Sequence, residues 1–233
     1  MKRRGFVSAL PTAIGMGIVA PTAPSSQKAL SGAGYSQDQL EVAQVVEVAW
    51  WARDMAQWDA MRAAYHPGAM VDISWLNGPA TEFVSRAKQI YELGGRSLHL
   101  HGPVLVDAHG DRATADIGAQ IFVAGNIKGV ECRVQSYIRI VDRLERRDGK
   151  WGIVLFQAIY QMDMMATANP GQRLDLDEEK LASYRSSYRY LSYYQAHYGI
   201  KPHPDLPGID RPESVDAVYR ANRLWLKGEG RKS

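Results

Sequence analysis

Two histidines, His99 and His101, stand two residues apart in a stretch that predicts a β-strand. Alternate residues of a strand point to the same side of a sheet, so both imidazoles can face one cavity. Such a pair could hold a metal ion if a third ligand is supplied, and Asp72, Asp116 and Glu131 are the nearby candidates. Without a metal, the pair is either structural or a site in which neutral His99 acts as a general base, because imidazole titrates near neutral pH.

Asp54 is the acidic residue most suited to chemistry in the preceding part of the chain. It falls where two predicted helices meet, and Trp50, Trp51 and Trp58 are its neighbours in sequence. A carboxylate in such surroundings is either a solvated helix end or a functional acid whose pKa is set by apolar walls.

A general base also needs hydrogen-bond donors that stabilise the negative charge developing on the substrate. Tyr65, Tyr137 and Arg139 are the candidate donors. Tyr137 and Arg139 belong to a polar face of a predicted strand that alternates with Ile138 and Ile140. That polar face either lines the pocket or faces solvent, and the pattern allows both.

Three helices and then a series of strands must position these residues. Ser36 is a plausible N-cap for the first helix, and Pro67 and Gly68 are expected to end the second. The helices are expected from Asp38 to about Trp50, from Met55 to Ala64 and from Ala80 to Leu93, the last ended by Gly94 and Gly95. The strands are expected at 70–75, 98–106, 113–124, 130–146 and 151–165, with turns at 109–111, 125–126 and 148–149. The order predicts an α+β fold in which a strongly bent, mostly antiparallel sheet wraps over three N-terminal helices and encloses a cone-shaped pocket.

Residues 166–233 form a predicted helical C-terminal extension. Helices are expected over Glu178–Tyr198 and Arg211–Lys227, the first with an apolar tyrosine-rich stripe. The stripe either packs on the domain or a dimer mate, or closes the pocket as a lid. Proline-rich sequence between the two helices stiffens the connection, which favours the packing role.

Composition sets further limits on function. The chain has 233 residues and a formal net charge of +3, which Lys2, Arg3 and Arg4 alone account for, so the remaining residues are near neutrality. This argues against a nucleic-acid-binding surface. Cys132 is the single cysteine, so no intrachain disulfide can form. The length suits one domain, expected at residues 35–165, with additions at both ends.

The N-terminal segment, residues 1–34, predicts an export signal followed by a linker. Arg3 and Arg4 precede a mildly apolar run that is too short for a membrane span and is broken by Pro11 and glycines. The arginine pair resembles a bacterial twin-arginine signal. We therefore expect a periplasmic or otherwise exported protein with no membrane attachment after signal removal; the alternative is a basic tail on a cytoplasmic protein.

Residues 36–165 resemble the SnoaL-like branch of the NTF2-like superfamily. The resemblance is carried by Asp54 with Trp58-Asp59, His66-Pro67, Trp75 with Gly78 and Phe83, His99-Leu-His-Gly102, Gly110-Asp111-Arg112-Ala113, and Arg139–Arg143 with Arg147–Trp151. It implies a cone-shaped α+β fold with a deep apolar pocket, usually as a homodimer, and chemistry on a hydrophobic small molecule without metal or organic cofactor. In scytalone dehydratase and similar lyases an Asp and a His pair inside the pocket, and Asp54 and His99 fall on those motif positions.

Two departures from the family pattern affect the site. The stretch 121–124 lacks a second catalytic histidine, for which His101 is a possible substitute, and Phe156 stands where the family often has an arginine. The predicted catalytic residues are Asp54, His99, Arg139 and Tyr65, and the predicted substrate-binding residues are Trp50, Trp58, Trp75, His101, Tyr137 and Phe156.

The resulting hypothesis is a cofactor-free lyase or isomerase acting on an aromatic or polycyclic compound, such as a lignin-derived diaryl compound or a steroid. His99 would remove a proton, and water, formaldehyde or another small group would leave. A binding protein with the same pocket but no turnover is the second hypothesis. A scaffold subunit is the third.

Overall fold

The computed structural model describes residues 34–228, which begin with a capped helix. Helix α1 spans Gln37–Asp54. Ser36 accepts a hydrogen bond from the backbone N–H of Gln39, and the Gln39 side chain accepts one from the Ser36 backbone N–H, so the expected N-cap is confirmed as a capping box. The expected signal and linker at residues 1–34 lie, except for Gly34, outside the described residues.

The second helix ends earlier than expected. Helix α2 covers Trp58–Ala63, and strand β1 begins at once and covers Tyr65–Ile73. Pro67 and Gly68 therefore lie inside a strand, and the prediction that they end the helix is wrong. They are tolerated because the pairing of β1 with β7 shifts register between Tyr65 and Met70, where Gly68 adopts a φ of 81°.

A short strand that the pattern did not predict, β2 (Leu76–Pro79), forms a hairpin with β1 and leads into helix α3 (Ala80–Glu92). The remaining strands are β3 (Ser97–His101), β4 (Leu105–His109), β5 (Arg112–Ile127), β6 (Val130–Arg147) and β7 (Lys150–Thr167). The turn between β6 and β7 is confirmed at Asp148 and Gly149, both with positive φ. The turn expected at Gly125 and Asn126 is wrong, because β5 continues to Ile127 and the chain reverses at Lys128 and Gly129, which supply the positive φ values.

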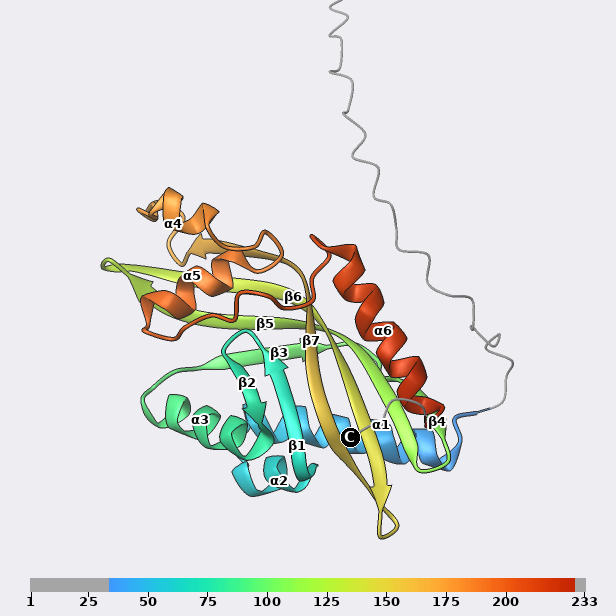
Figure 1. Cartoon of the computed structure of the whole chain (residues 1–233). Helices are drawn as coiled ribbons and strands as arrows, with labels where there is room; N and C mark the ends of the chain where they lie inside the picture. The colour runs from blue at the N-terminus through green and yellow to red at the C-terminus, as the bar shows by residue number, and fades with distance from the viewer. Residues whose placement is uncertain (1–33, 229–233) are drawn as a thin grey trace, which may run out of the picture. The chain divides into compact units, whose positions relative to one another are not determined.

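The strands form one curved, open sheet in the order β2-β1-β7-β6-β5-β3, with β4 also paired to β5. Only β1 and β7 are parallel among these pairs, so the expected α+β fold with a mostly antiparallel sheet is confirmed. The sheet bends over α1, α2 and α3 (Figure 1). Val46 of α1 packs with Ile117, Ile140 and Leu144 in the main core, which identifies the inner face of the sheet.

As far as residue 228, the C-terminal extension contains three helices: α4 (Glu178–Ala182), α5 (Arg189–His197) and α6 (Pro212–Leu226). The continuous helix expected over Glu178–Tyr198 is wrong. Tertiary contacts break it: Ser187 donates a hydrogen bond to Asp210, and the buried Tyr188 ring lies 4.7 Å from that of Tyr160.

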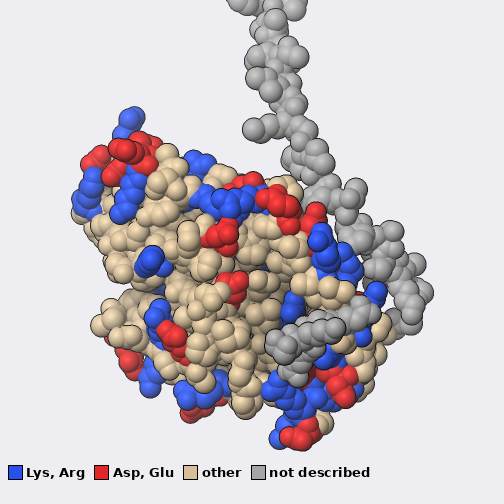
Figure 2. All heavy atoms as spheres, in the orientation of Figure 1, with Lys and Arg blue, Asp and Glu red and all other residues tan. Residues whose placement is uncertain are grey.

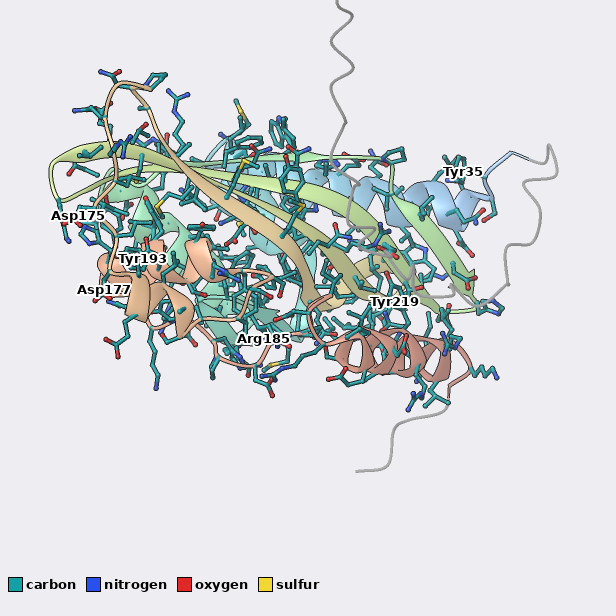
Figure 3. All side chains as sticks on the ribbon, turned by 90° about the horizontal axis from the view of Figure 1, so that it is seen from above. Tyr35, Asp175, Asp177, Arg185, Tyr193 and Tyr219 are labelled. Atoms are coloured by element: carbon teal, nitrogen blue, oxygen red, sulfur yellow. The ribbon has the colours of Figure 1, made fainter. Side chains whose placement is uncertain are left out.

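Helix α6 covers the outer face of the sheet. Val215 and Val218 form a small core with Val141 and Ile159 of β6 and β7. Figure 3 shows α1 and α6 on opposite sides of the long strands, with Tyr219 labelled on α6. Helix α6 therefore packs on the outer face of β6 and β7.

Charged side chains of both signs are interspersed on the face of the molecule in Figure 2. Within residues 34–228, no helix combines the length and the apolar character that a membrane span requires.

Candidate active site

The main cavity lies between the inner face of the sheet and helices α1, α3 and α5, and has a volume of about 120 Å³. Its wall is mostly apolar. Aromatic rings come from Trp50, Trp75, Phe83, Phe156 and Tyr160, and polar side chains from Arg53, Ser74, Arg96, Ser97, His99, Tyr194 and Gln195. Of the six predicted substrate-binding residues, the structure thus places Trp50, Trp75 and Phe156 in this wall.

Asp54 and His99 meet at the edge of this cavity. Asp54 is the last residue of α1, and His99 is the central residue of β3. The Nδ1 atom of His99 lies 2.6 Å from Oδ1 of Asp54, and the backbone N–H of His99 donates to Oδ2 at 2.8 Å. Because one carboxylate holds both the ring and the backbone of His99, the imidazole is fixed with Nδ1 as its donor and Nε2 as its unprotonated nitrogen.

Arg53 faces the same imidazole. Its guanidinium contacts Nε2 of His99, and its Cζ atom lies 5.5 Å from the centre of the Phe83 ring. A guanidinium is a donor only, so Nε2 must be the acceptor and His99 is neutral in this arrangement. Sequence reasoning did not identify Arg53, although it is next to Asp54. An arginine in the last turn of a helix is most simply explained by the helix dipole.

Burial and charge explain the protonation states. Burial, and then the Arg53 cation, lower the pKa of His99 to about 4, against the opposing effect of Asp54. For Asp54, burial acts to raise the pKa, but the hydrogen bonds from the ring and backbone of His99 and the Arg53 cation outweigh it, so the pKa lies below its ordinary value. Burial also lowers the pKa of Arg53, whereas the negative charge of Asp54 acts to raise it. At neutral pH the group is therefore a carboxylate, a neutral imidazole and a guanidinium.

His101 does not share the cavity with His99. Both side chains lie on the inner face, as the alternation predicts, and their rings lie 5.1 and 5.8 Å from that of Trp50. However, only His99 lines the cavity, and His101 Nε2 lies 3.4 Å from a carboxylate oxygen of Glu47. The expectation that both histidines face one cavity is wrong, because α1 crosses β3 and its residues Glu47 and Trp50 occupy the space at His101.

Arg139 and Tyr137 lie on the outer face of the sheet, so their predicted place in the site is wrong. The Arg139 guanidinium pairs with Asp116 at 2.6 Å, and Asp116 also accepts a hydrogen bond from Tyr219 of α6. The Tyr137 hydroxyl accepts a hydrogen bond from Gln135 on the same face. The inward-facing positions of β6 are occupied by Ile138 and Ile140, which line the cavity.

Tyr65 and Trp58 lie near the cavity but not in its wall. Tyr65 borders a small void beneath it with Trp50, Arg53 and Phe83, and burial raises the pKa of its hydroxyl. Trp58 borders a separate pocket of about 50 Å³ on the other side of Asp54. Their predicted contact with substrate is therefore not supported by their positions.

Helix α5 supplies a wall that sequence reasoning missed. Leu191, Tyr194 and Gln195 line the cavity, although a packing role without pocket contact was expected for the extension. Gln195 donates a hydrogen bond to Ser74 at 2.7 Å, a contact between residues 121 positions apart. A separation of that size leaves no local pattern from which the contact could be predicted.

The third ligands considered for a metal site lie elsewhere. Asp116 is on the outer face with Arg139, and Asp72 accepts hydrogen bonds from Asn77 and Gln157. In the part of the chain that the structure describes, His, Cys, Asp and Glu side chains form no cluster of three or more suited to a metal.

Comparison with known proteins places the chain in a family. Residues 34–157 match the model of the SnoaL-like domain, and the chain belongs to this family, as the sequence resemblance indicated. A PEP2-like protein of Fusarium vanettenii is 33% identical over 187 residues, which are 76% of this chain and 80% of that protein. Pea pathogenicity protein 2 of the same fungus is 32% identical with the same coverage. Among solved structures, an NTF2-like protein from Pseudomonas putida is similar over 62% of this chain and 99% of its own, with 16% identity and a TM-score of 0.45.

Proposed function

We propose that this protein is a cofactor-free lyase or isomerase in which Asp54 and His99 transfer a proton to and from an apolar, aromatic small molecule. The contact of 2.6 Å between His99 Nδ1 and Asp54 Oδ1 at the edge of the cavity carries the proposal. Membership of the SnoaL-like family, in which such chemistry is common, supports it.

In this mechanism His99 removes a proton from a carbon atom of the substrate through Nε2. Asp54 keeps the proton on Nδ1 and stabilises the imidazolium that forms. The electron pair left on carbon moves toward a neighbouring carbonyl oxygen, giving an enolate. In a lyase, the C–O bond on the adjacent carbon then breaks as the His99 imidazolium gives its proton to the leaving hydroxyl, so that water departs and His99 is neutral again. In an isomerase, the imidazolium returns the proton to a different carbon.

Arg53 is the cation of the cavity wall that contacts His99, and it can stabilise the enolate. Its guanidinium already lies against Nε2, so a substrate oxygen that binds next to the abstracted proton comes within its reach. Arg53 must leave Nε2 before the imidazole can accept a proton. Entry of the substrate would therefore move the guanidinium from His99 to the substrate oxygen, and Arg53 takes the role that was predicted for Arg139.

The cavity volume limits the substrate. A cavity of about 120 Å³ is close to the roughly 150 Å³ of an engineered cavity that binds benzene. A compound with one ring fits this space. A polycyclic compound would require α5 or Arg53 to move.

A non-catalytic binding protein is the second candidate, and one observation favours it. Arg53 occupies Nε2, and the low pKa of His99, about 4, makes this imidazole a weak base in the free protein. In this case the same cavity would bind an aromatic compound without turnover.

Hydrogen exchange distinguishes the two candidates. Phenyl ketones and phenyl-substituted β-hydroxy ketones would be incubated with the protein in D₂O, and exchange of the hydrogen next to the carbonyl, or elimination of water, followed by proton NMR. His99→Ala should slow exchange by about two to four orders of magnitude. His109→Ala, which changes an exposed histidine on β4, is the matched control and should exchange like the wild type. Binding without any exchange across the panel would support the binding protein instead.

We also propose a homodimer formed through the uncovered part of the outer face. Leu98, Leu100, Met162 and Met164 are 45 to 53% exposed there. The strand register aligns them in two rows, Leu98–Phe122–Gln135–Met164 and Leu100–Gln120–Tyr137–Met162. Exposed apolar side chains gathered on one face of a sheet are typical of subunit contacts. Leu100→Glu should convert a dimer to a monomer in sedimentation velocity, and a monomeric wild type would contradict the proposal.

Export through a twin-arginine pathway is a further proposal, supported by Arg3 and Arg4. Expressed in a bacterium with that pathway, the chain should reach the periplasm, and replacement of both arginines by lysine should retain it in the cytoplasm. Retention of the unchanged chain would favour the cytoplasmic alternative.

A further inference from the structure

Gln195 lines the cavity and carries a buried hydrogen-bond acceptor without a partner among the described residues. The residue is 5% exposed and lines the cavity from α5. Its Nε2 donates to Ser74 Oγ at 2.7 Å, whereas its Oε1 is buried and has no hydrogen-bond partner among residues 34–228. A buried amide oxygen without a partner is costly, because it has lost its water without replacement.

The amide is held in place from several sides. The backbone N–H of Ser74 donates to the Tyr160 hydroxyl at 2.9 Å, which fixes the residue that receives Nε2. Helix α5 itself is fastened to the sheet: Tyr194 donates to the carbonyl of Ala124 at 2.8 Å, and the backbone N–H of Leu191 donates to Asp163 at 2.8 Å. Oε1 is therefore a preorganised acceptor, not a mobile surface group.

Gln195 and His99 approach the cavity from different walls. Gln195 belongs to α5, Ser74 to the turn between β1 and β2, and Tyr160 to β7. His99 and Arg53 belong to β3 and α1. A molecule that fills the cavity can contact both groups at once. Because the remaining wall is mostly apolar, a single polar contact at Gln195 would strongly affect which compounds bind.

We propose that the ligand carries a hydroxyl or N–H group that donates to Oε1 of Gln195, so that this residue selects hydroxylated or amino-substituted rings over purely apolar ones. The inference rests on the proposed use of the cavity for a small aromatic compound. It does not require turnover.

Phenol and toluene test the proposal, because they have nearly the same shape and only phenol can donate. Their affinities would be measured by NMR titration of the wild type and of Gln195→Met. The substitution should weaken phenol binding about tenfold, as expected for one lost hydrogen bond, and change toluene binding less than twofold. Gln172→Met, the same replacement at an exposed residue away from the cavity, is the control and should change neither affinity.

Equal changes for both ligands, or phenol binding unchanged in Gln195→Met, would overturn the proposal. If the variant does not fold, the wild type decides: the side-chain amide signal of Gln195 should shift with phenol and not with toluene, and equal responses would reject the inference. A failure of the proposed function looks different, because His99→Ala would then leave hydrogen exchange unchanged while the preference for phenol persists.

Discussion

His99 and Asp54 are joined twice, once through the imidazole Nδ1 at 2.6 Å and once through the backbone N–H at 2.8 Å, by the two oxygens of one carboxylate. Replacement of Asp54 by Asn should preserve the backbone contact through the amide oxygen. The amide nitrogen would then face Nδ1 and favour the tautomer with its proton on Nε2, which cannot act as a base.

We therefore expect Asp54→Asn to slow hydrogen exchange about 10²- to 10⁴-fold while the melting temperature changes little. Nitrogen-15 NMR of His99 would report the tautomer directly. Asp107→Asn, at an exposed aspartate of β4, is the control. An Asp54→Asn variant that exchanges at the wild-type rate would exclude Asp54 from the mechanism.

The titration of His99 should depend on Arg53. Because the pKa of His99 is lowered to about 4, the unfolded chain binds a proton that the folded chain does not between about pH 4 and 6.5. This residue therefore makes the protein less stable as the pH falls through that window. Arg53→Met should raise the pKa of His99 toward its ordinary value, since the neighbouring cation is removed, and NMR titration of the His99 ring would measure it. No change in the titration would show that burial alone sets this pKa.

Asp142 should make the protein less stable as the pH rises above the ordinary aspartate range. It lies in the core of β6 at 0% exposure, neither of its oxygens has a hydrogen-bond partner within residues 34–228, and burial, then Asp116, raise its pKa well above the ordinary value. The folded state thus holds a proton that the unfolded state releases, so stability falls as the pH rises above the ordinary aspartate range.

The variant Asp142→Asn cannot ionise and should gain melting temperature relative to the wild type as the pH increases from 5 to 9. Thermal denaturation of both proteins across this range measures the difference, with Asp107→Asn as the control. A constant difference would show that Asp142 does not titrate in the native protein.

Asp163 links the docking of α5 to pH in the acidic range. Burial raises its pKa to about 6, against the backbone hydrogen bonds that it accepts from α5. Between about pH 4 and 6 the folded state holds the proton more tightly, so this contribution to stability is lost as the pH rises through the window. Relative to the wild type, Asp163→Asn should become more stable as the pH rises from 4 to 6.5, and the backbone amides of α5 should exchange more slowly in the variant than in the wild type at pH 6.5. If the variant and the wild type show the same difference in α5 exchange at pH 4 and at pH 6.5, the prediction is contradicted.

Local patterns were sufficient for much of the fold. The capped first helix, the third helix and the turn at Asp148 and Gly149 each depend on neighbouring residues, and all were predicted. The break before α5 depends on contacts of Tyr188 and Ser187 with distant residues, and no local signal reports them.

In the candidate site, too, some residues were predicted from the sequence and others became clear only in the folded structure. Asp54 and His99 could be placed together through the family motifs, but alternation along β6 defines two faces without showing which is the inner one, so Arg139 and Tyr137 were assigned to the wrong side. Arg53 and Gln195 were missed because their roles follow from the fold alone.

The boundary of the SnoaL-like match has a consequence for how this protein can change. The match ends at residue 157, whereas Tyr160, Leu191 and Gln195 of the cavity wall lie beyond it. The proposed acid–base pair, Asp54 and His99, and this part of the cavity wall therefore lie in separate stretches of the chain. If the proposed function holds, randomising residues 188–200 in a directed-evolution library would vary ligand preference while Asp54 and His99 stay unchanged.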